Sequence, residues 1–147
     1  MKSSEEKYQM DYTHSEGPWV ETAVKLVVRK ADLDADFVSR TLSLPPTKVQ
    51  HPGSDQRGRA SSDDGLWILQ VHERSPGGVG DQLRSLLDRL EPRSSSLAEL
   101  ALQGYDIRLD LFGFVGRGAT FVLDPEVVRK AAALRVPVTV TTSVSDR

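Results

Sequence analysis

The chain has 147 residues, of which 38% are hydrophobic and 27% are charged, a composition typical of one soluble globular domain. It contains no cysteine, which excludes disulfides, thiolate metal sites and cysteine nucleophiles. The formal charge of −2 creates no field that would attract nucleic acid, and no apolar run approaches the ~18 residues of a membrane-spanning helix.

The first residues of the chain are polar and show neither helical nor strand periodicity. We expect a flexible tail over residues 1–19 and a single domain over residues 20–147. A secretory signal would place an apolar stretch of roughly 7–15 residues after the early lysine, and the sequence has none there. The expected location is therefore the cytoplasm.

The domain is predicted to begin with a strand and a short helix. Residues 23–29 are rich in β-branched side chains, which indicates a strand. Asp32 or Asp34 can then cap a helix over Ala35–Leu42, because a carboxylate accepts from the unpaired amides of the first turn. The helix has to end before the adjacent prolines Pro45-Pro46, which lack an amide donor.

A long loop and a second strand are predicted next. Residues 47–65 hold almost no apolar side chain beyond Val49, and loops of this length are usually functional or disordered. Residues 66–73 indicate a strand, whose core face carries Trp67, Leu69 and Val71.

The middle of the chain predicts two helices and a strand. Residues 79–90 carry the clearest helical pattern, with apolar side chains at i, i+4, i+7, i+8 and i+11. A shorter helix over residues 97–103 has Gly104 in place to end it. Residues 105–112 alternate between apolar and charged side chains, which predicts a strand with one solvated face.

The last part of the chain predicts a hairpin, a helix and a closing strand. The glycine-rich segment 113–118 indicates a turn, after which residues 119–123 return as the hairpin partner. Asp124-Pro125 is typical of a helix start. Residues 136–144 are rich in valine and threonine and predict a final strand, which can form a sheet edge that pairs with another chain.

The order of these elements predicts the fold class. A β-α-β unit, two helices and a β-β-α-β unit follow one another, and the strands have one apolar and one polar face. Such strands require helices on a single side of the sheet, so we expect an α+β two-layer sandwich with a mainly antiparallel sheet. A ferredoxin-like arrangement, or a doubled split β-α-β, satisfies this order.

A resemblance to a known family extends from Val20 to Val144. The segments that carry it are Val24-Lys25-Leu26, Asp34–Leu44, Pro45-Pro46-Thr47, Gly65–Leu69, Leu83–Leu90, Ile107–Leu111, Phe121–Glu126 and Val136–Thr142. On these segments the chain resembles a bacterial family catalogued as domain of unknown function four-two-seven-nine. The resemblance implies an α+β domain without an established activity, and it transfers no catalytic residue.

No motif in the sequence selects particular residues for catalysis or metal binding. The three histidines include no His-x₃₋₅-His pair, so no metal site is predicted. No Gly-x-Ser-x-Gly elbow occurs. The segment 113–118 resembles a phosphate loop only superficially, because a strand rather than a helix is expected after it. We therefore expect no cofactor and favour a protein that is not an enzyme.

The first functional hypothesis is a noncatalytic protein-binding module of the immunity or adaptor type. Asp106, Arg108 and Asp110 place alternating charges on a solvated sheet face, and Arg117 lies in the predicted turn. An uncovered sheet can receive a protein partner or a second copy of the chain. The candidate partner-binding residues are Arg108, Asp110 and Arg117. Nucleic acid and membrane are not expected as partners, since the domain is neutral overall and has no long apolar run.

The second hypothesis is a small-ligand-binding domain, or an enzyme without a recognisable motif. In this case the loop over residues 47–65 closes over the sheet edge. Its candidate ligand-binding residues are His51, Arg57, Asp64 and His72. A concave pocket lined by these side chains is the observation that the hypothesis requires.

Overall fold

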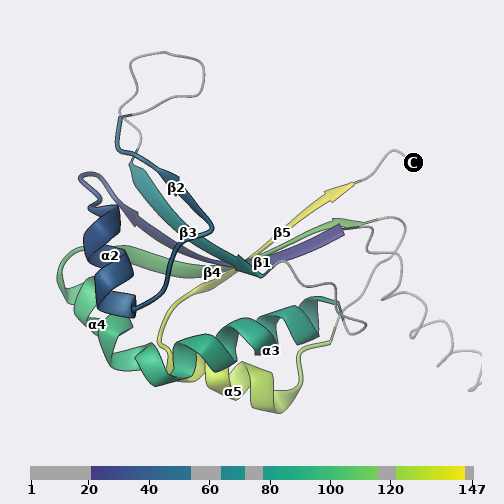
Figure 1. Cartoon of the computed structure of the whole chain (residues 1–147). Coiled ribbons are helices and arrows are strands. Elements are labelled where there is room, and N and C mark those ends of the chain that lie inside the picture. Colours follow the sequence, from purple (N-terminus) through teal and green to yellow (C-terminus); the bar gives the residue numbers. More distant parts are fainter. Residues whose placement is uncertain (1–20, 54–63, 72–77, 116–121, 145–147) are drawn as a thin grey trace, which may run out of the picture.

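The computed structural model of the chain describes residues 21–53, 64–71, 78–115 and 122–144. Figure 1 shows a strongly twisted sheet with the helices gathered on one side of it. The elements in chain order are β1 (Glu21–Lys30), α2 (Ala35–Leu42), β2 (Lys48–Gln50), β3 (Gly65–Val71), α3 (Val79–Leu90), the 3₁₀ turn η1 (Glu91–Arg93), α4 (Ser94–Leu102), β4 (Asp106–Val115), α5 (Pro125–Ala133) and β5 (Val138–Val144).

The sheet has five strands in the order β2-β3-β1-β4-β5. β1 pairs antiparallel with both β3 and β4, and β2 pairs antiparallel with β3. β4 and β5 are parallel, and α5 lies between them in the chain. The α+β class is thus confirmed. The sheet is mixed, however, and the ferredoxin-like arrangement is not confirmed.

The turn predicted to begin at Gly113 is wrong, and most of the hairpin partner predicted over residues 119–123 lies outside the described residues. β4 continues through Gly113 to Val115, and Val122 and Leu123 are not part of a strand. β4 is hydrogen-bonded to β1 along one edge and to β5 along the other. The chain instead crosses to β5 through α5, because parallel neighbours need a crossover connection.

The predicted loop over residues 47–65 contains a short strand at its beginning. β2 has three residues and pairs with β3 at the edge of the sheet. The amide of Gln70 donates to the Thr47 hydroxyl oxygen at 2.9 Å, which ties the start of β2 to β3. Three residues are too few to show the alternation by which a strand is recognised in a sequence.

The predicted core is confirmed between the sheet and the helices. Trp67, which belongs to β3, is fully buried, and its indole N–H donates to the Ser39 hydroxyl on α2 at 3.0 Å. Other fully or almost fully buried side chains come from the three central strands and from α2, α3, α4 and α5, and they include Val24, Leu26, Val28, Ile107, Leu109, Leu111, Leu83, Leu86, Leu87 and Leu90. The apolar stripe of α3 therefore packs on the apolar face of the sheet, as its periodicity predicts.

The helix ends follow the predicted capping. Asp34 accepts a hydrogen bond from the amide of Phe37 at 3.1 Å and begins α2. Gly104 follows α4 with φ +93°, and its amide and that of Tyr105 donate to Ala101 and Leu100. This pair of bonds is a Schellman motif, in which glycine adopts the left-handed conformation without steric cost.

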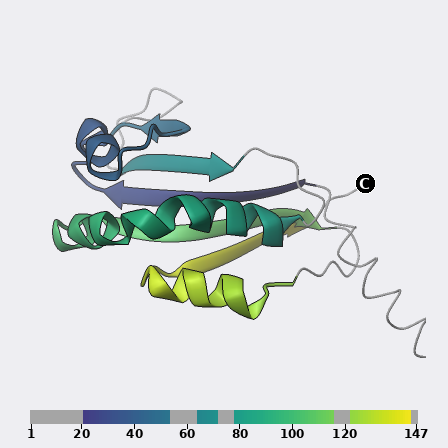
Figure 2. The ribbon, with the colours of Figure 1, turned by 60° about the horizontal axis from the view of Figure 1, so that its bottom comes forward.

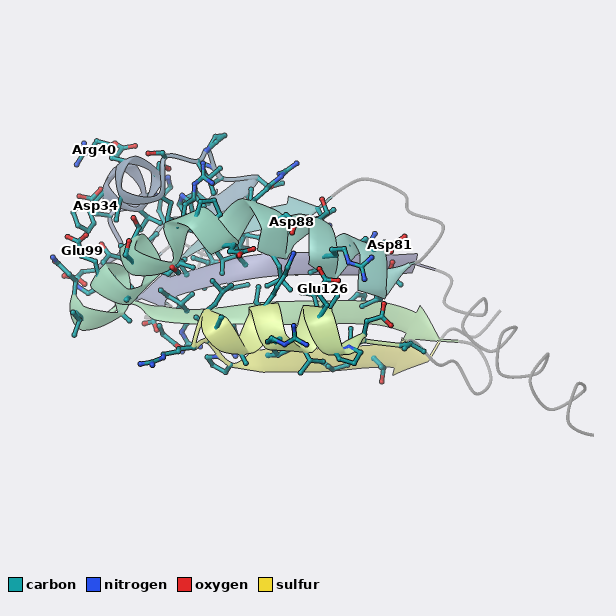
Figure 3. All side chains as sticks on the ribbon, turned by 90° about the horizontal axis from the view of Figure 1, so that it is seen from below. Asp34, Arg40, Asp81, Asp88, Glu99 and Glu126 are labelled. Carbon is teal, nitrogen blue, oxygen red and sulfur yellow. The ribbon has the colours of Figure 1, made fainter. Side chains whose placement is uncertain are left out.

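An ion-pair cluster joins α5 to α3. The Lys130 ammonium lies 2.9 Å from Asp88 on α3 and 3.5 Å from Glu126 on its own helix. Asp88 and Glu126 are labelled on the neighbouring helices in Figure 3. The hydrogen bond to Asp88 is the main reason that the pKa of Lys130 is raised above its ordinary value of 10.5. This side of α5 consequently faces α3.

We expect Ser39→Ala to lower the free energy of unfolding by about 1–3 kcal/mol, because the buried indole N–H of Trp67 loses its acceptor. Urea unfolding followed by circular dichroism measures the difference. Ser95→Ala, on the exposed surface of α4, is the matched control and should change stability little. Equal effects of the two substitutions would show that the hydrogen bond is not what stabilises this contact.

We expect Lys130→Met to lower the melting temperature at neutral pH and low salt. A raised pKa in the folded protein means that the lysine stabilises the fold below pH 10.5 and that this contribution is lost as the pH rises through the raised value. The difference from the unsubstituted chain should therefore shrink in alkaline buffer and in high salt. Arg129→Met, an exposed cation on the same helix, is the control. A difference in melting temperature that changes with neither pH nor salt would contradict an electrostatic origin of the stabilisation.

Candidate interaction surface

The side of the sheet turned away from the helices carries both charged and apolar side chains. Successive residues of a strand point to opposite faces, so the residues between the buried ones lie on this second face. We call it the open face. It consists of Lys25, Val27 and Arg29 on β1, Lys48 and Gln50 on β2, Leu66, Ile68 and Gln70 on β3, Asp106, Arg108, Asp110 and Phe112 on β4, and Thr139 and Thr141 on β5.

The centre of the open face is apolar. Val27 lies directly opposite Ile68 on β3 and Arg108 on β4. It is only 7% exposed, although Figure 1 shows the helices on the other side of the sheet. Ile68 and Phe112 are half-buried on the same face. A partner placed here would meet apolar atoms already held in position by the strands around them.

Charges of both signs surround this centre. The strand register places Lys25 opposite Asp110, and Arg29 opposite Asp106. Opposite charges that face each other across neighbouring strands stabilise their pairing. The β1 cations therefore lie beside the β4 carboxylates on the open face.

Two of the predicted partner-binding residues lie on the open face. The Arg108 guanidinium is 3.9 Å from the Asp106 carboxylate, and its side chain remains about one third exposed, at 32%. The Asp110 carboxylate accepts a hydrogen bond from the Thr139 hydroxyl of β5. The third, Arg117, lies outside the described residues. Arg108 and Asp110 thus lie on one strand. Arg108 contacts Asp106 of the same strand, and Asp110 contacts Thr139 of the neighbouring strand.

Two of the predicted ligand-binding residues, His51 and Asp64, lie at one end of the sheet. His51 follows β2 and Asp64 precedes β3, so the antiparallel pairing of these strands brings both to the same end. There the Asp64 carboxylate forms an ion pair with Arg29 at 2.7 Å, and its carbonyl accepts from Gln50 at 3.3 Å. Gly65 allows this close packing, because a Cβ atom would lie 2.6 Å from Leu33 Cβ.

The other two ligand candidates, Arg57 and His72, lie outside the described residues. His51 and Asp64 are the two candidates that the structure describes, and they lie at the same end of the sheet.

The sequence also contains a pattern that indicates the apolar centre, although the charged residues alone do not reveal it. Val27, Leu66 and Ile68 fall on the polar side of their strands by simple alternation, so apolar side chains stand where a solvated face expects polar ones. Their assembly into one patch depends on the strand order, which brings β3 beside β1. The patch is thus a tertiary feature.

Comparison with known proteins places the chain in a family. A family model described as a domain of unknown function (DUF4279) matches residues 20–145. No curated protein and no solved structure matches the chain.

Neither a metal-binding cluster nor a membrane-spanning helix is found among the described residues. Within these segments no group of three or more histidine and carboxylate side chains is arranged to hold a metal ion. No helix among residues 21–53, 64–71, 78–115 and 122–144 has both the length and the apolar character to cross a bilayer.

We expect the Arg29–Asp64 ion pair to couple the end of the long loop to β1. A double-mutant cycle of Arg29→Ala and Asp64→Ala should give a coupling energy of about 0.2–1 kcal/mol, because both side chains are partly exposed. Urea unfolding of the four proteins provides the value, and added salt should reduce it. A coupling of zero at low salt would mean that the pair does not hold the loop end.

Proposed function

The chain belongs to the DUF4279 family, and we propose that it is a noncatalytic protein-binding module that recognises its partner with the open face of the sheet. The type of module we propose is a bacterial immunity or adaptor protein that acts in the cytoplasm. The single observation that supports the proposal best is the composition of the open face, in which an apolar centre is surrounded by charges of both signs.

The open face has the composition of a protein interface. Specific interfaces combine a buried apolar centre with a polar rim, and arginine and aromatic side chains are enriched in them. Here Val27 and Ile68 form the centre, Phe112 adds an aromatic ring, and Arg108 lies directly beside Val27. Such an arrangement favours a partner that supplies apolar atoms at its centre and complementary charges around them.

The extent of the open face also favours a macromolecule. Five strands spaced about 4.8 Å apart span roughly 19 Å, and the longer strands add a length of about 20 Å or more. This is an extended surface of several hundred Å², the scale that each partner of a specific complex buries. Small-molecule sites, in contrast, are concave and surround most of their ligand.

The proposal is tested by charge reversal in a measured complex. The tagged full-length protein is first used to capture its partner from a native lysate, and the purified pair is then studied by calorimetry. We expect Lys25→Glu and Arg108→Glu each to raise the Kd about tenfold or more, because each reversal places a repulsive charge beside the apolar centre.

Arg40→Glu is the matched control for these reversals. Arg40 is an exposed cation on α2, on the helix side of the molecule (Figure 3), and its reversal should leave the Kd unchanged. An unchanged Kd for both open-face reversals would overturn the site assignment. An equal loss in all three variants would show that net charge, and not the open face, governs binding.

A further inference from the structure

The two edges of the sheet differ in how well they are protected against pairing with another strand. β2 has only three residues, begins with Lys48, and lies between Pro46 and Pro52. Short length, lysine and proline are the features by which natural sheets block their edges. β5 has seven residues and contains neither a charge nor a proline. Within the described part of the chain it pairs only with β4.

The backbone of β5 directs hydrogen-bonding groups toward this second edge. The carbonyl oxygen of Pro137 accepts from the Leu109 amide at 2.9 Å, so it points toward β4. Because backbone groups alternate along a strand, the N–H and C=O groups of Val138, Val140 and Thr142 point the other way. β5 is therefore a parallel partner of β4 on one side and a template for a further strand on the other.

Apolar side chains accompany this edge. In the described segments five large apolar side chains are exposed, and three of them lie on β5 and α5: Val138 at 41%, Val140 at 52% and Val128 at 50%. Val128 and Lys130 are two residues apart, which places them on nearly opposite sides of the helix. Since Lys130 contacts α3, Val128 is turned away from α3. Figure 2 shows α5 beside α3 and along β5, so this side of α5 adjoins the β5 edge.

We propose that two copies of the chain associate through this edge. The β5 strands pair antiparallel around a two-fold axis at Thr141, and the two sheets join into one. Thr141 is the middle residue of β5, and this register gives every outward N–H and C=O group of the strand a partner in the other copy. Val140 then lies opposite Thr142 of the partner subunit, and the two α5 helices lie alongside each other.

A second copy is the occupant that the charges favour. A two-fold interface brings each patch against the same patch of the other subunit, so a charged patch would repel itself. β5 and the exposed Val128 and Ala132 on α5 carry no charge, and they are therefore complementary to themselves. The interface is distinct from the open face and does not depend on the proposed partner.

The first test is the mass of the full-length protein in solution. Sedimentation velocity between about 1 μM and about 1 mM, a range that brackets moderate affinities, should show a monomer converting to a dimer. Val140→Lys should raise the dimer dissociation constant at least tenfold, because it removes an apolar contact and places a cation in each half of the interface. Leu102→Lys alters an apolar side chain on α4 that is 88% exposed, and it should leave the dimer intact.

The second test addresses the register. The chain has no cysteine, so Thr141→Cys and Thr139→Cys each introduce a single thiol on the same face of the same strand. With the axis at residue 141, the two Thr141 positions are about 4.5 Å apart between Cα atoms, within disulfide range. The two Thr139 positions are offset by four residues, or roughly 13 Å. After a thiol reagent has shown that both thiols are accessible, mild oxidation should cross-link only the first variant.

The outcomes separate this proposal from the proposed function. A monomer throughout the concentration range, or a dimer that Val140→Lys leaves unchanged while circular dichroism shows a folded protein, overturns the β5 interface. Equal cross-linking of the two thiol variants, or none in either, overturns the register. None of these measurements contains a partner protein, so binding at the open face can fail or succeed independently.

Discussion

The alternation of side chains along β1 is the constraint on which the rest of the structure depends. β1 lies in the middle of the sheet and is paired on both edges, with β3 and with β4. Val24, Leu26 and Val28 are fully buried toward the helices, and the residues between them form the open face. A one-residue slip of the strand would exchange these two sets and place Lys25 and Arg29 in the core. Burying unpaired charges costs several kcal/mol each, so the strand has one stable orientation.

The helices are held to this sheet and to each other by a few specific polar contacts. The Arg93 guanidinium donates to the carbonyl oxygen of Leu42 at 2.6 Å and to that of Arg89 at 2.6 Å. It thereby satisfies carbonyl groups near the ends of α2 and α3, which lack partners inside their own helices. The position of α2 in turn brings Ser39 to the Trp67 indole. These contacts orient the helical side of the molecule, and no helix of the described residues covers the other side of the sheet (Figure 1).

The two proposed surfaces use different physical interactions. On the open face, the apolar centre around Val27 supplies buried area, and the charges of Lys25, Arg108 and Asp110 supply discrimination between partners. At the β5 edge, main-chain hydrogen bonds supply the contact, and the absence of charge permits a strand to meet its own copy. In such a dimer the open faces of both copies lie on the same side of one continuous sheet. A partner with two binding sites would then gain avidity from the pair.

The sequence by itself determined the features that depend on neighbouring residues in the chain. The bounds predicted for α2 and α3 agree with the structure, because capping by Asp34 and the apolar stripe of α3 are local properties. The core faces of β1, β3 and β4 follow from alternation alone, and the end of α4 follows from Gly104. The β5 strand was also predicted as a sheet edge, and it lies at one.

Only the tertiary structure decided which strands lie side by side. Gly113 is paired with Thr22 on β1 and with Thr142 on β5, although glycine in that position suggested a turn. The three residues of β2 carry no strand pattern in the sequence, and they form a strand because they pair with the edge of β3. The apolar centre of the open face combines Val27 with Ile68 and Arg108, which are far apart in the chain. Periodicity states which way a side chain points, but its neighbours across the sheet are set by hydrogen bonding between distant segments and by the burial that follows from it.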